Sequence, residues 1–279
     1  MKFCADPSPL SVSAIQSALG LCSLGRDMHI HDEVLSTNTM ALALVDSGAN
    51  HGTIVLAEQQ TAGRGRWGRS WFSPPKKNLY CSVILKEVYP KDRLSWIPLI
   101  TGLAITQAIE ELANLRPSLK WPNDILVGDR KLGGVLCEST PQGTRRRAIV
   151  VGFGINVNSR IEEFPEDLHL SSTTLAAETG RLFDRNHLAA RILSNLEVHY
   201  ERLRSQSLQE VRAPYLASCS TIGRQICIRL VNGEDIKGLA LDIGRDGALR
   251  LAPSIEFPHA QKSSKEVMEI RSGEVVHVR

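Results

Sequence analysis

A segment rich in glycine and arginine carries the strongest chemical signal in this sequence. It runs from Gln60 to Trp71 and interleaves three glycines, three arginines and two tryptophans, namely Gly63, Gly65, Gly68, Arg64, Arg66, Arg69, Trp67 and Trp71. Glycine allows positive φ angles and a close approach of the backbone to a ligand. Arginine offers a fork of donors that fits phosphate and carboxylate. The segment predicts a loop that wraps an anionic small molecule, although a solvated basic loop has the same composition.

Three further groups of polar residues stand where a ligand could bind. Ser36-Thr-Asn38 precedes a helical apolar pattern, so its hydroxyls and amide either cap the helix or bind a polar ligand group. Asn123 and Asp124 follow a proline, and they either order a tight turn or present an amide and a carboxylate to ATP and Mg²⁺. Lys131 comes just before a pair of glycines, where the backbone can approach a ligand, and this weighs against a solvated turn lysine.

A Gly-x-Gly pair lies inside an apolar run that ends with two asparagines. The glycines are Gly152 and Gly154, and the asparagines are Asn156 and Asn158. Because the pair does not open a helix, it is not a dinucleotide-binding fingerprint. The spacing instead indicates a central strand with one face left open.

Composition narrows the classes of protein that fit. The chain has 279 residues, 42% hydrophobic and 23% charged, which is enough for one sizeable core and a small second domain. A net charge of +3 is too mild to indicate a nucleic-acid-binding protein. The six cysteines form no C-x-x-C pair and are typical of reduced thiols in a cytoplasmic protein. We find no membrane-spanning run and no signal peptide.

Hydrophobic periodicity assigns the candidate residues to elements. Strands are predicted over 29–35, 53–57, 78–85, 119–127 (broken by Pro122), 129–138 (after a hairpin turn) and 148–158. Helices are predicted over 11–19, 36–45, 94–115, 174–180, 185–205 and 208–219. We expect Ser36 to cap the second helix and Pro117 to stop the long helix that precedes it.

The character of the sequence changes at Gly223. Short alternating strands are predicted over 225–230, 235–242, 248–251 and 274–278, with turn signals between them. Such spacing predicts a small barrel of about 55 residues. We therefore expect a leader over 1–28, a main domain over 29–220 and a barrel over 221–279.

Six motifs occur in an order that matches a known family. They are Ser36-Thr-Asn, Gln60 with Gly63-Arg-Gly-Arg-Trp-Gly, Trp71-Phe-Ser, Lys120-Trp-Pro-Asn-Asp, Arg130-Lys-Leu-Gly-Gly and Gly152-Phe-Gly-Ile-Asn. Together they resemble the biotin–protein ligase family (holocarboxylase synthetase, BirA type) from residue 30 to the C-terminus. The resemblance implies an α/β (α+β) fold: a mixed-sheet catalytic domain similar to class II aminoacyl-tRNA synthetases and lipoate ligases, then an SH3-like barrel. It also implies an enzyme that makes biotinyl-5′-adenylate from biotin and MgATP. That enzyme passes biotin to a lysine of a biotin carboxyl carrier domain, as in acetyl-CoA carboxylase.

The resemblance carries roles onto particular residues. Contacts to biotin are implied for Ser36, Thr37, Asn38, Gln60, Gly63, Arg64, Gly65, Arg66, Lys131, Gly134 and Leu136. Contacts to ATP or the adenylate are implied for Arg66, Trp71, Asn123, Asp124 and Asn156. Lys131, Arg66 and Asp124 are the implied catalytic residues, with Asp124 also the implied Mg²⁺ ligand. These residues suit a reaction in which two anions must meet, and a closing loop would keep water from the adenylate.

Two departures from the family pattern alter the expectations. Residues 1–28 are too short for the winged helix of bifunctional members, so we expect a ligase without operator binding. Residues 253–265 form a longer stretch than the usual barrel loop. The resemblance implies a cytoplasmic enzyme without a membrane partner, and it is compatible with a homodimer.

Two other functions remain open at this point. The first is a lipoate ligase or octanoyltransferase of the same architecture, against which the Lys120-Trp-Pro-Asn-Asp motif and the glycine–arginine loop both argue. The second is not an enzyme but a protein whose basic loop and tryptophans bind single-stranded nucleic acid by charge and stacking. The low net charge argues against the second function.

Overall fold

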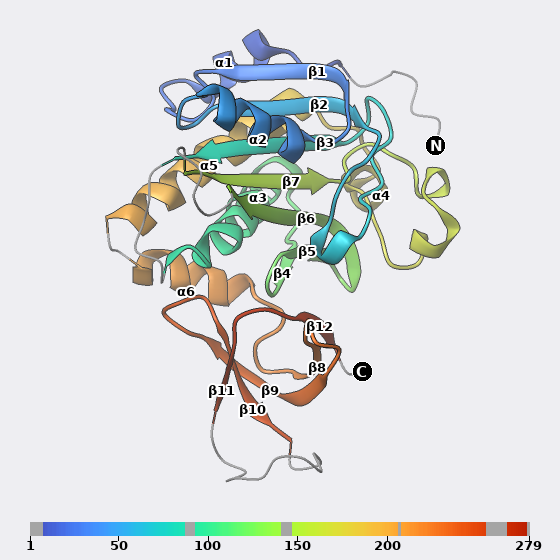
Figure 1. Cartoon of the computed structure of the whole chain (residues 1–279). Coiled ribbons are helices and arrows are strands. Elements are labelled where there is room, and N and C mark those ends of the chain that lie inside the picture. Colours follow the sequence, from blue (N-terminus) through green and yellow to red (C-terminus); the bar gives the residue numbers. More distant parts are fainter. Residues whose placement is uncertain (1–7, 87–92, 141–146, 206–207, 255–266, 278–279) are drawn as a thin grey trace.

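Two β-sheets organise the protein (Figure 1). The computed structural model describes residues 8–86, 93–140, 147–205, 208–254 and 267–277. The first sheet has seven strands in the order β1-β2-β3-β7-β6-β5-β4; β1 and β2 are parallel, and the other neighbours are antiparallel. Its strands are β1 (Met28–Val34), β2 (Ile54–Gln60), β3 (Leu79–Leu85), β4 (Ser118–Lys120), β5 (Asp124–Val127), β6 (Arg130–Ser139) and β7 (Ile149–Ile155). This mixed sheet, beside a separate smaller one, confirms the predicted fold class.

Helices cover both faces of the large sheet (Figure 1). They are α1 (Val12–Leu19), α2 (Thr37–Ser47), α3 (Trp96–Ala113), α4 (Leu175–Thr179), α5 (Arg185–Arg204) and α6 (Leu208–Ser218). On one face, α2 packs against alternate apolar residues such as Val55, Ile84 and Val150. On the other face, α3 and α5 cover the main core, which includes Leu56 and Phe153. The apolar alternation of the strands thus buries both sides of the sheet and makes it a rigid frame.

One predicted helix end is wrong. Helix α3 stops at Ala113, because Asn114 takes the left-handed conformation (φ 51°) and its backbone N–H bonds to the carbonyl of Glu110. Asparagine tolerates this conformation and closes a helix without a proline. Pro117 therefore lies beyond the end of the helix rather than causing it.

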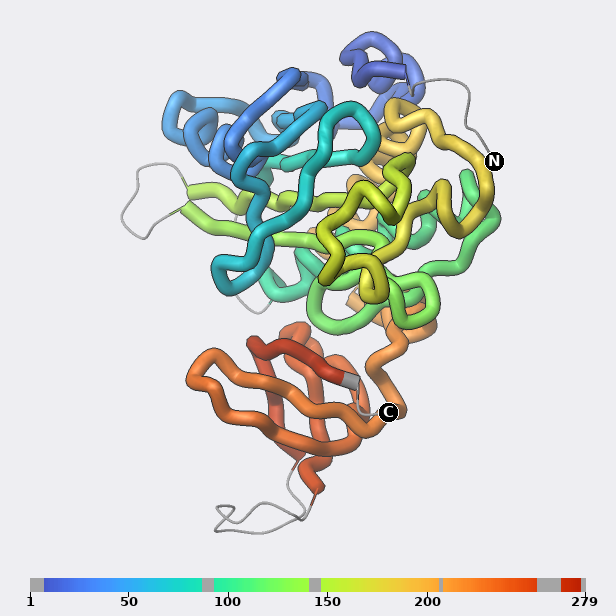
Figure 2. Tube along the Cα trace, turned by 90° about the vertical axis from the view of Figure 1, so that its right-hand side faces the viewer, coloured from blue at the N-terminus to red at the C-terminus, as the bar shows by residue number. Residues whose placement is uncertain are grey.

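The second sheet lies beyond α6, at the C-terminal end of the chain (Figure 2). Its strand order is β11-β10-β9-β8-β12, all antiparallel, with strands β8 (Gln225–Arg229), β9 (Asp235–Ile243), β10 (Leu249–Pro253), β11 (Met268–Ile270) and β12 (Glu274–His277). The sequence did not predict β11. Most of the stretch 253–265 lies outside the described residues. The domain boundary near residue 220 stays a prediction.

Two buried tryptophans join the C-terminal sheet to the main body. The indole N–H of Trp96 donates to the carbonyl of Arg245 at 2.8 Å, and that of Trp121 donates to the carbonyl of Gly247 at 3.1 Å. The backbone N–H of Trp121 also donates to the hydroxyl of Thr221 at 3.0 Å. Because these contacts are buried, they fix the small sheet against the β4–β5 turn.

The leader is anchored by a buried ion pair that the sequence did not reveal. Arg185 on α5 contacts Glu58 on β2, and both side chains are almost fully buried. Glu58 also accepts from the backbone N–H of Leu10 at 2.7 Å, while Arg185 donates to the carbonyl of Ser8 at 2.9 Å. The leader residues thereby satisfy part of the hydrogen-bonding capacity of two buried charges, which would otherwise be costly.

Two sequence-based expectations concern the environment of the chain. Within the described ranges, no helix is long and apolar enough to cross a membrane. The five cysteines that the structure describes are unpaired, and burial raises the pKa of the Cys22 and Cys137 thiols to about 12. These thiols are protonated at neutral pH and are therefore poor nucleophiles.

Candidate active site

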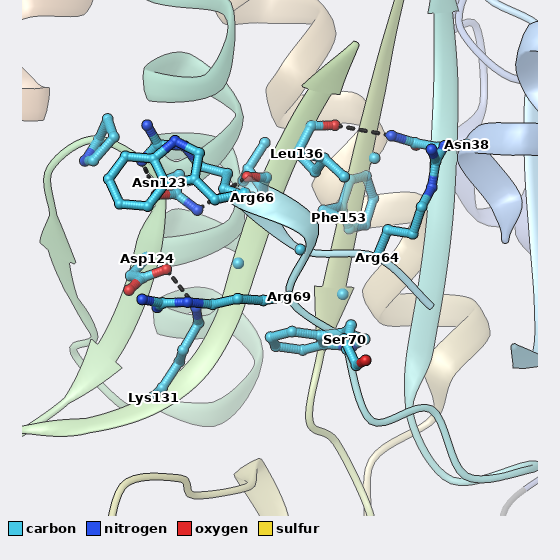
Figure 3. Close-up of a pocket in the computed structure, with 18 of the residues that line it drawn as sticks. Asn38, Arg64, Arg66, Arg69, Ser70, Asn123, Asp124, Lys131, Leu136 and Phe153 are labelled. Carbon is cyan, nitrogen blue, oxygen red and sulfur yellow. Dashed lines mark hydrogen bonds and ion pairs between the residues drawn. The ribbon is translucent and has the colours of Figure 1, made fainter. Parts of the chain in front are cut away.

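The predicted site residues meet around one cavity of about 140 Å³ (Figure 3). The cavity lies against strands β6 and β7, under the glycine–arginine loop, and its edge includes β12 of the C-terminal sheet. Among the predicted residues, its lining contains Ser36, Thr37, Asn38, Gln60, Arg64, Gly65, Arg66, Trp71, Asn123, Asp124, Lys131, Gly134 and Leu136. Gly63 and Asn156 are the predicted residues that do not line it. Segments more than 90 positions apart in sequence therefore form one site.

A hydrogen-bond network closes one end of the cavity. The backbone N–H of Thr37 donates to the side-chain carbonyl of Gln60 at 2.9 Å, and the Gln60 amide donates to the hydroxyl of Ser73 at 3.0 Å. Asn38 accepts from Ser82 at 2.6 Å and donates to Glu138 at 2.8 Å. These bonds fix polar groups in a buried place, as recognition of an uncharged polar ring requires.

Ser36 stands at the N-cap position of α2, but its side chain makes no capping hydrogen bond. The prediction that its hydroxyl caps the helix is therefore wrong in its chemistry. Ser36 is only 4% exposed and lines the cavity, so its hydroxyl is available to a ligand. The ligand-binding alternative raised from the sequence gains support from this geometry.

The two glycines of β7 make room for two cavity residues. A Cβ atom at Gly152 would lie 2.1 Å from Oδ1 of Asn38, and one at Gly154 would lie 2.4 Å from Nε1 of Trp71. Contacts this short do not occur, so any larger residue would displace the side chain above it. The open strand face predicted from the Gly-x-Gly pair holds Asn38 and Trp71.

The glycine–arginine loop lies over the cavity with a tight, partly strained backbone. An isolated bridge joins Arg64 to Ser70, and the N–H of Gly65 donates to the carbonyl of Arg69 at 2.7 Å. Trp67 has φ 57° and ψ 36°, a left-handed conformation that is unusual for a bulky residue. Such strain is found where the surrounding structure imposes a function-bearing conformation.

Two arginines of the loop reach separate parts of the site. Arg64 pairs with Glu138 at 2.8 Å, the same carboxylate oxygen that accepts from Asn38. Arg66 donates to the side-chain oxygen of Asn123 at 3.1 Å and to the carbonyl of Gly273 at 3.2 Å. Burial lowers the pKa of Arg66, whereas nearby Asp124 raises it. The guanidinium is nevertheless charged at neutral pH.

A lysine and an aspartate face each other beneath the loop. Nζ of Lys131 lies 2.6 Å from Oδ1 of Asp124 and 5.5 Å from the centre of the Trp71 ring (Figure 3). The indole N–H of Trp71 is buried and has no partner within the described residues. A cation paired with a carboxylate therefore lies over the Trp71 ring, and the cation suits an anionic ligand.

Replacing Lys131 with alanine is expected to weaken binding of biotin, the ligand that the resemblance implies, about 10- to 100-fold, because a charged hydrogen bond to its carboxylate is lost. The side chain is one-third exposed, so the fold should tolerate the change. Calorimetric titration with biotin measures the effect. The matched control is Arg130→Ala, which removes the neighbouring cation, paired with Glu178 away from the cavity. Wild-type affinity in the Lys131 variant would contradict this assignment.

The C-terminal sheet contributes a carboxylate to the loop. Arg69 makes two hydrogen bonds to the carboxylate of Glu274, one of them 2.6 Å long. The Arg69 hydrogen bond lowers the pKa of Glu274, and the same bond raises the pKa of Arg69. Figure 2 shows the loop, in blue-cyan, reaching down toward the C-terminal sheet. The small sheet is therefore part of the site.

We expect Glu274→Gln to increase the rate at which the adenylate that the resemblance implies escapes or hydrolyses by no more than about fivefold, because a solvent-exposed ion pair contributes little. Stopped-flow release of labelled adenylate measures this rate. Added salt should reduce the difference between the variant and the wild type. Glu269→Gln, which removes one of the two carboxylates paired with Arg271 elsewhere on the same sheet, should change nothing. An equal effect of the two variants would show that the Arg69–Glu274 pair does not hold the loop.

A second cavity of about 500 Å³ adjoins the first. The rings of Phe72 and Phe164 lie 5.2 Å apart at its wall, with Leu126 and Asn156 also lining it. The side-chain amide of Asn156 donates to the carbonyl of Thr173 at 3.0 Å, so part of its capacity serves the fold. Phe72, Leu126, Phe164 and Leu168 form an apolar patch in a wall that otherwise carries mainly charged and polar side chains. Such a patch suits one face of a flat heterocyclic ring.

Several cavity residues escaped sequence reasoning. Lys120 lies in the Lys120-Trp-Pro-Asn-Asp motif, but only Asn123 and Asp124 of that motif were predicted to contact a ligand. Glu138 and Glu274 gave no signal, because their partners Arg64 and Arg69 lie 74 and 205 positions away. Phe164 sits in a proline-containing loop without a motif. Only the fold brings these residues to the site.

Comparison with known proteins gives consistent matches. Residues 32–156 match the model of the biotin/lipoate A/B protein ligase family. A biotin–[acetyl-CoA-carboxylase] ligase from Mycobacterium tuberculosis is 32% identical, with 97% of each chain covered. The bifunctional ligase/repressor BirA of Bacillus subtilis is 34% identical over 88% of this chain and 75% of its own. The structure of a biotin protein ligase from Aquifex aeolicus in complex with biotin and ATP has a TM-score of 0.75 and 30% identity, covering 91% of this chain and 99% of its own.

Proposed function

Because the chain belongs to the biotin–protein ligase family, we propose that it activates biotin with ATP and attaches it to a lysine of a carrier protein. The enzyme is an ATP-dependent biotin ligase. Its first product is biotinyl-5′-adenylate, and its acceptor is a biotin carboxyl carrier domain. The sequence is also compatible with a homodimer. This stays a prediction, which a sedimentation experiment would test.

One observation carries this proposal: a small cavity with a polar end and a larger cavity with an aromatic patch share a wall of cationic side chains. Arg69, Lys120 and Lys131 line both cavities, and Arg66 covers the first. The polar end of the first cavity suits the ring of biotin, and the aromatic patch of the second cavity suits the adenine of ATP. Their junction is where a carboxylate and an α-phosphate, both negatively charged, would meet. Fixed cations there reduce the repulsion between the two reactants.

The residue roles follow from this arrangement. We assign the biotin ring to the end formed by Ser36-Thr-Asn38 and Gln60, and the biotin carboxylate to Lys131. Arg66 faces the forming acyl phosphate from the loop, where it stabilises charge that develops on the phosphoryl oxygens. The loop and the C-terminal sheet keep water from the adenylate, which otherwise hydrolyses.

In the second step the acceptor amine must lose a proton. Asp124 lies at the junction of the two cavities and is the carboxylate nearest to Lys131. We assign it as the base that receives this proton once the substrate carboxylate has taken its place beside Lys131. Proton transfer by a positioned carboxylate is ordinary general base catalysis.

Asp124 also fits the Mg²⁺ ion that the resemblance implies. Among the described residues, no three His, Cys, Asp or Glu side chains gather as a metal site. Mg²⁺ is commonly held by one or two carboxylates together with substrate phosphates, and Asp124 with Asn123 beside it offers such a donor set. A bound Mg²⁺ would neutralise phosphate charge and favour departure of pyrophosphate. We further infer a cytoplasmic location, because five unpaired cysteines are typical of a reducing compartment.

The decisive experiment is ATP-dependent transfer of labelled biotin to a purified carrier domain. Transfer that requires ATP, biotin and the acceptor lysine supports the proposal. Substituting lipoate for biotin tests the related lipoate ligase activity, and adenylate formed from lipoate instead of biotin would refute the assignment. Oligonucleotide binding that is sensitive to salt and indifferent to biotin would favour the nucleic-acid alternative.

A further inference from the structure

We propose that Lys120 is a further catalytic residue, whose ammonium group binds the phosphoryl group at which biotin and AMP are joined; this inference rests on the proposed function. Lys120 lines both the smaller and the larger cavity. The residues shared by the two cavities are Arg69, Ser70, Trp71, Lys120, Asp124, Lys131 and Glu274. The shared wall is the place where the two substrates must touch.

Lys120 differs from the other two cations of this wall. Arg69 is hydrogen-bonded to Glu274, and Lys131 is paired with Asp124. Over the part of the chain that the structure describes, the ammonium group of Lys120 makes neither a hydrogen bond nor an ion pair. A partly buried cation without a partner is costly and can be retained for a ligand.

The side chains of the shared wall carry a net positive charge, which also favours binding of an anion. Three cations face two carboxylates, so a substrate anion restores neutrality there. Burial lowers the pKa of Lys120, and the nearby Asp124 counteracts this effect. The ammonium group is therefore partly stripped of water, which strengthens its attraction to a phosphate.

The position of Lys120 is set by the fold before any ligand binds. Lys120 ends β4 opposite Asp124, and its carbonyl accepts from the N–H of Asn123 at 3.2 Å in the turn that follows. The next residue, Trp121, is 2% exposed and hydrogen-bonded to Thr221 and Gly247. A lysine on such a rigid support loses less entropy when it binds a phosphate.

Lys120 can serve both half-reactions without transferring a proton. In the first, a carboxylate oxygen of biotin bonds to the α-phosphorus while the bond to the pyrophosphate oxygen breaks, and pyrophosphate leaves with the electron pair. In the second, the acceptor nitrogen bonds to the acyl carbon while the carbon–oxygen bond breaks, AMP leaves with that pair, and the proton of the nitrogen passes to Asp124. The same phosphoryl group carries negative charge in both transition states, and a fixed ammonium group stabilises it.

The test compares two inert adenylate analogues, one with an anionic phosphodiester link and one with an uncharged link. Lys120→Met keeps most of the aliphatic chain and removes the charge. We expect it to weaken binding of the anionic analogue about 10- to 100-fold, in line with the loss of a charged hydrogen bond. Binding of the uncharged analogue and of biotin alone should change less than about threefold, within the effect expected when no charged contact is lost. Lys120→Arg should restore most of the affinity for the anionic analogue.

Biotin-dependent pyrophosphate exchange gives the catalytic readout and should fall at least as far in Lys120→Met. Lys237→Met, which alters an exposed lysine on β9 outside both cavities, is the matched control. Lys120→Gln replaces Lys120→Met if the latter does not fold. Equal losses for both analogues, or wild-type exchange, would overturn the role of Lys120. A wild-type enzyme that makes no adenylate would instead refute the proposed function itself.

Discussion

Replacing Arg66 with alanine is expected to reduce synthesis of biotinyl-adenylate about 10³-fold while leaving the fold intact. Arg66 is the loop arginine that is both partly buried and held over the β4–β5 turn, through Asn123 at 3.1 Å and the carbonyl of Gly273 at 3.2 Å. In the proposed function, these contacts hold its guanidinium where the reacting phosphate would bind. A loss of this size is typical when an arginine that stabilises a phosphoryl transition state is removed.

Biotin-dependent pyrophosphate exchange measures the effect on synthesis, and far-UV circular dichroism checks the fold. Arg66→Lys retains the charge but not the planar fork, so it should recover only part of the rate. Arg229→Ala is a matched control, because Arg229 pairs with Asp235 on the C-terminal sheet and lies outside both cavities. Unaltered turnover in Arg66→Ala would refute the role of the loop.

The positions of the strands along the chain could be predicted from the sequence for a clear reason. Buried strands such as Ile54–Gln60 and Ile149–Ile155 are short, strongly apolar and bounded by turn residues. The six motifs could be placed at their ends, and the structure brings those ends to one cavity. The long helices were found for the same reason, through apolar residues at helical spacing.

What the sequence concealed depends on contacts between distant residues. Glu274 lies 205 positions from Arg69, and Arg185 lies 127 positions from Glu58, so no local pattern could pair them. The ending of α3 at Asn114 was missed because proline is the stronger breaker, whereas asparagine acts through a backbone conformation that the sequence does not display. The sequence left Ser36 as either a helix cap or a ligand contact, and only the geometry shows that its side chain makes no capping hydrogen bond.

Lys120 shows most clearly what could not be predicted from the sequence. Its motif was recognised, but whether a lysine is paired depends on the carboxylates around it in space. In the fold, Asp124 forms an ion pair with Lys131 and Glu274 forms one with Arg69. Lys120 is therefore left without a partner among the described residues. The catalytic proposal for Lys120 was therefore beyond the reach of sequence reasoning.

Gly152→Ala is expected to abolish measurable biotin binding, with a loss of affinity of about 100-fold or more, because the methyl group takes the space of Asn38. The added Cβ would lie 2.1 Å from Oδ1 of Asn38. Asn38 cannot move aside cheaply, since Ser82, Glu138 and the carbonyl of Leu136 hold it. Calorimetry with biotin measures the loss, and nucleotide binding in the neighbouring cavity should be retained.

A double-mutant cycle with Asn38→Ala separates the clash from a general defect. Overpacking costs about 1–3 kcal/mol, so Gly152→Ala should lower the free energy of unfolding by that amount in the wild-type background. When residue 38 is already alanine, the same change should cost almost nothing, because the clashing atoms are gone. Biotin binding should stay lost in the double variant, since Asn38 forms the polar end of the cavity. Equal destabilisation in both backgrounds would mean that Gly152 serves the sheet rather than Asn38, and the position assigned to the biotin ring would then be wrong.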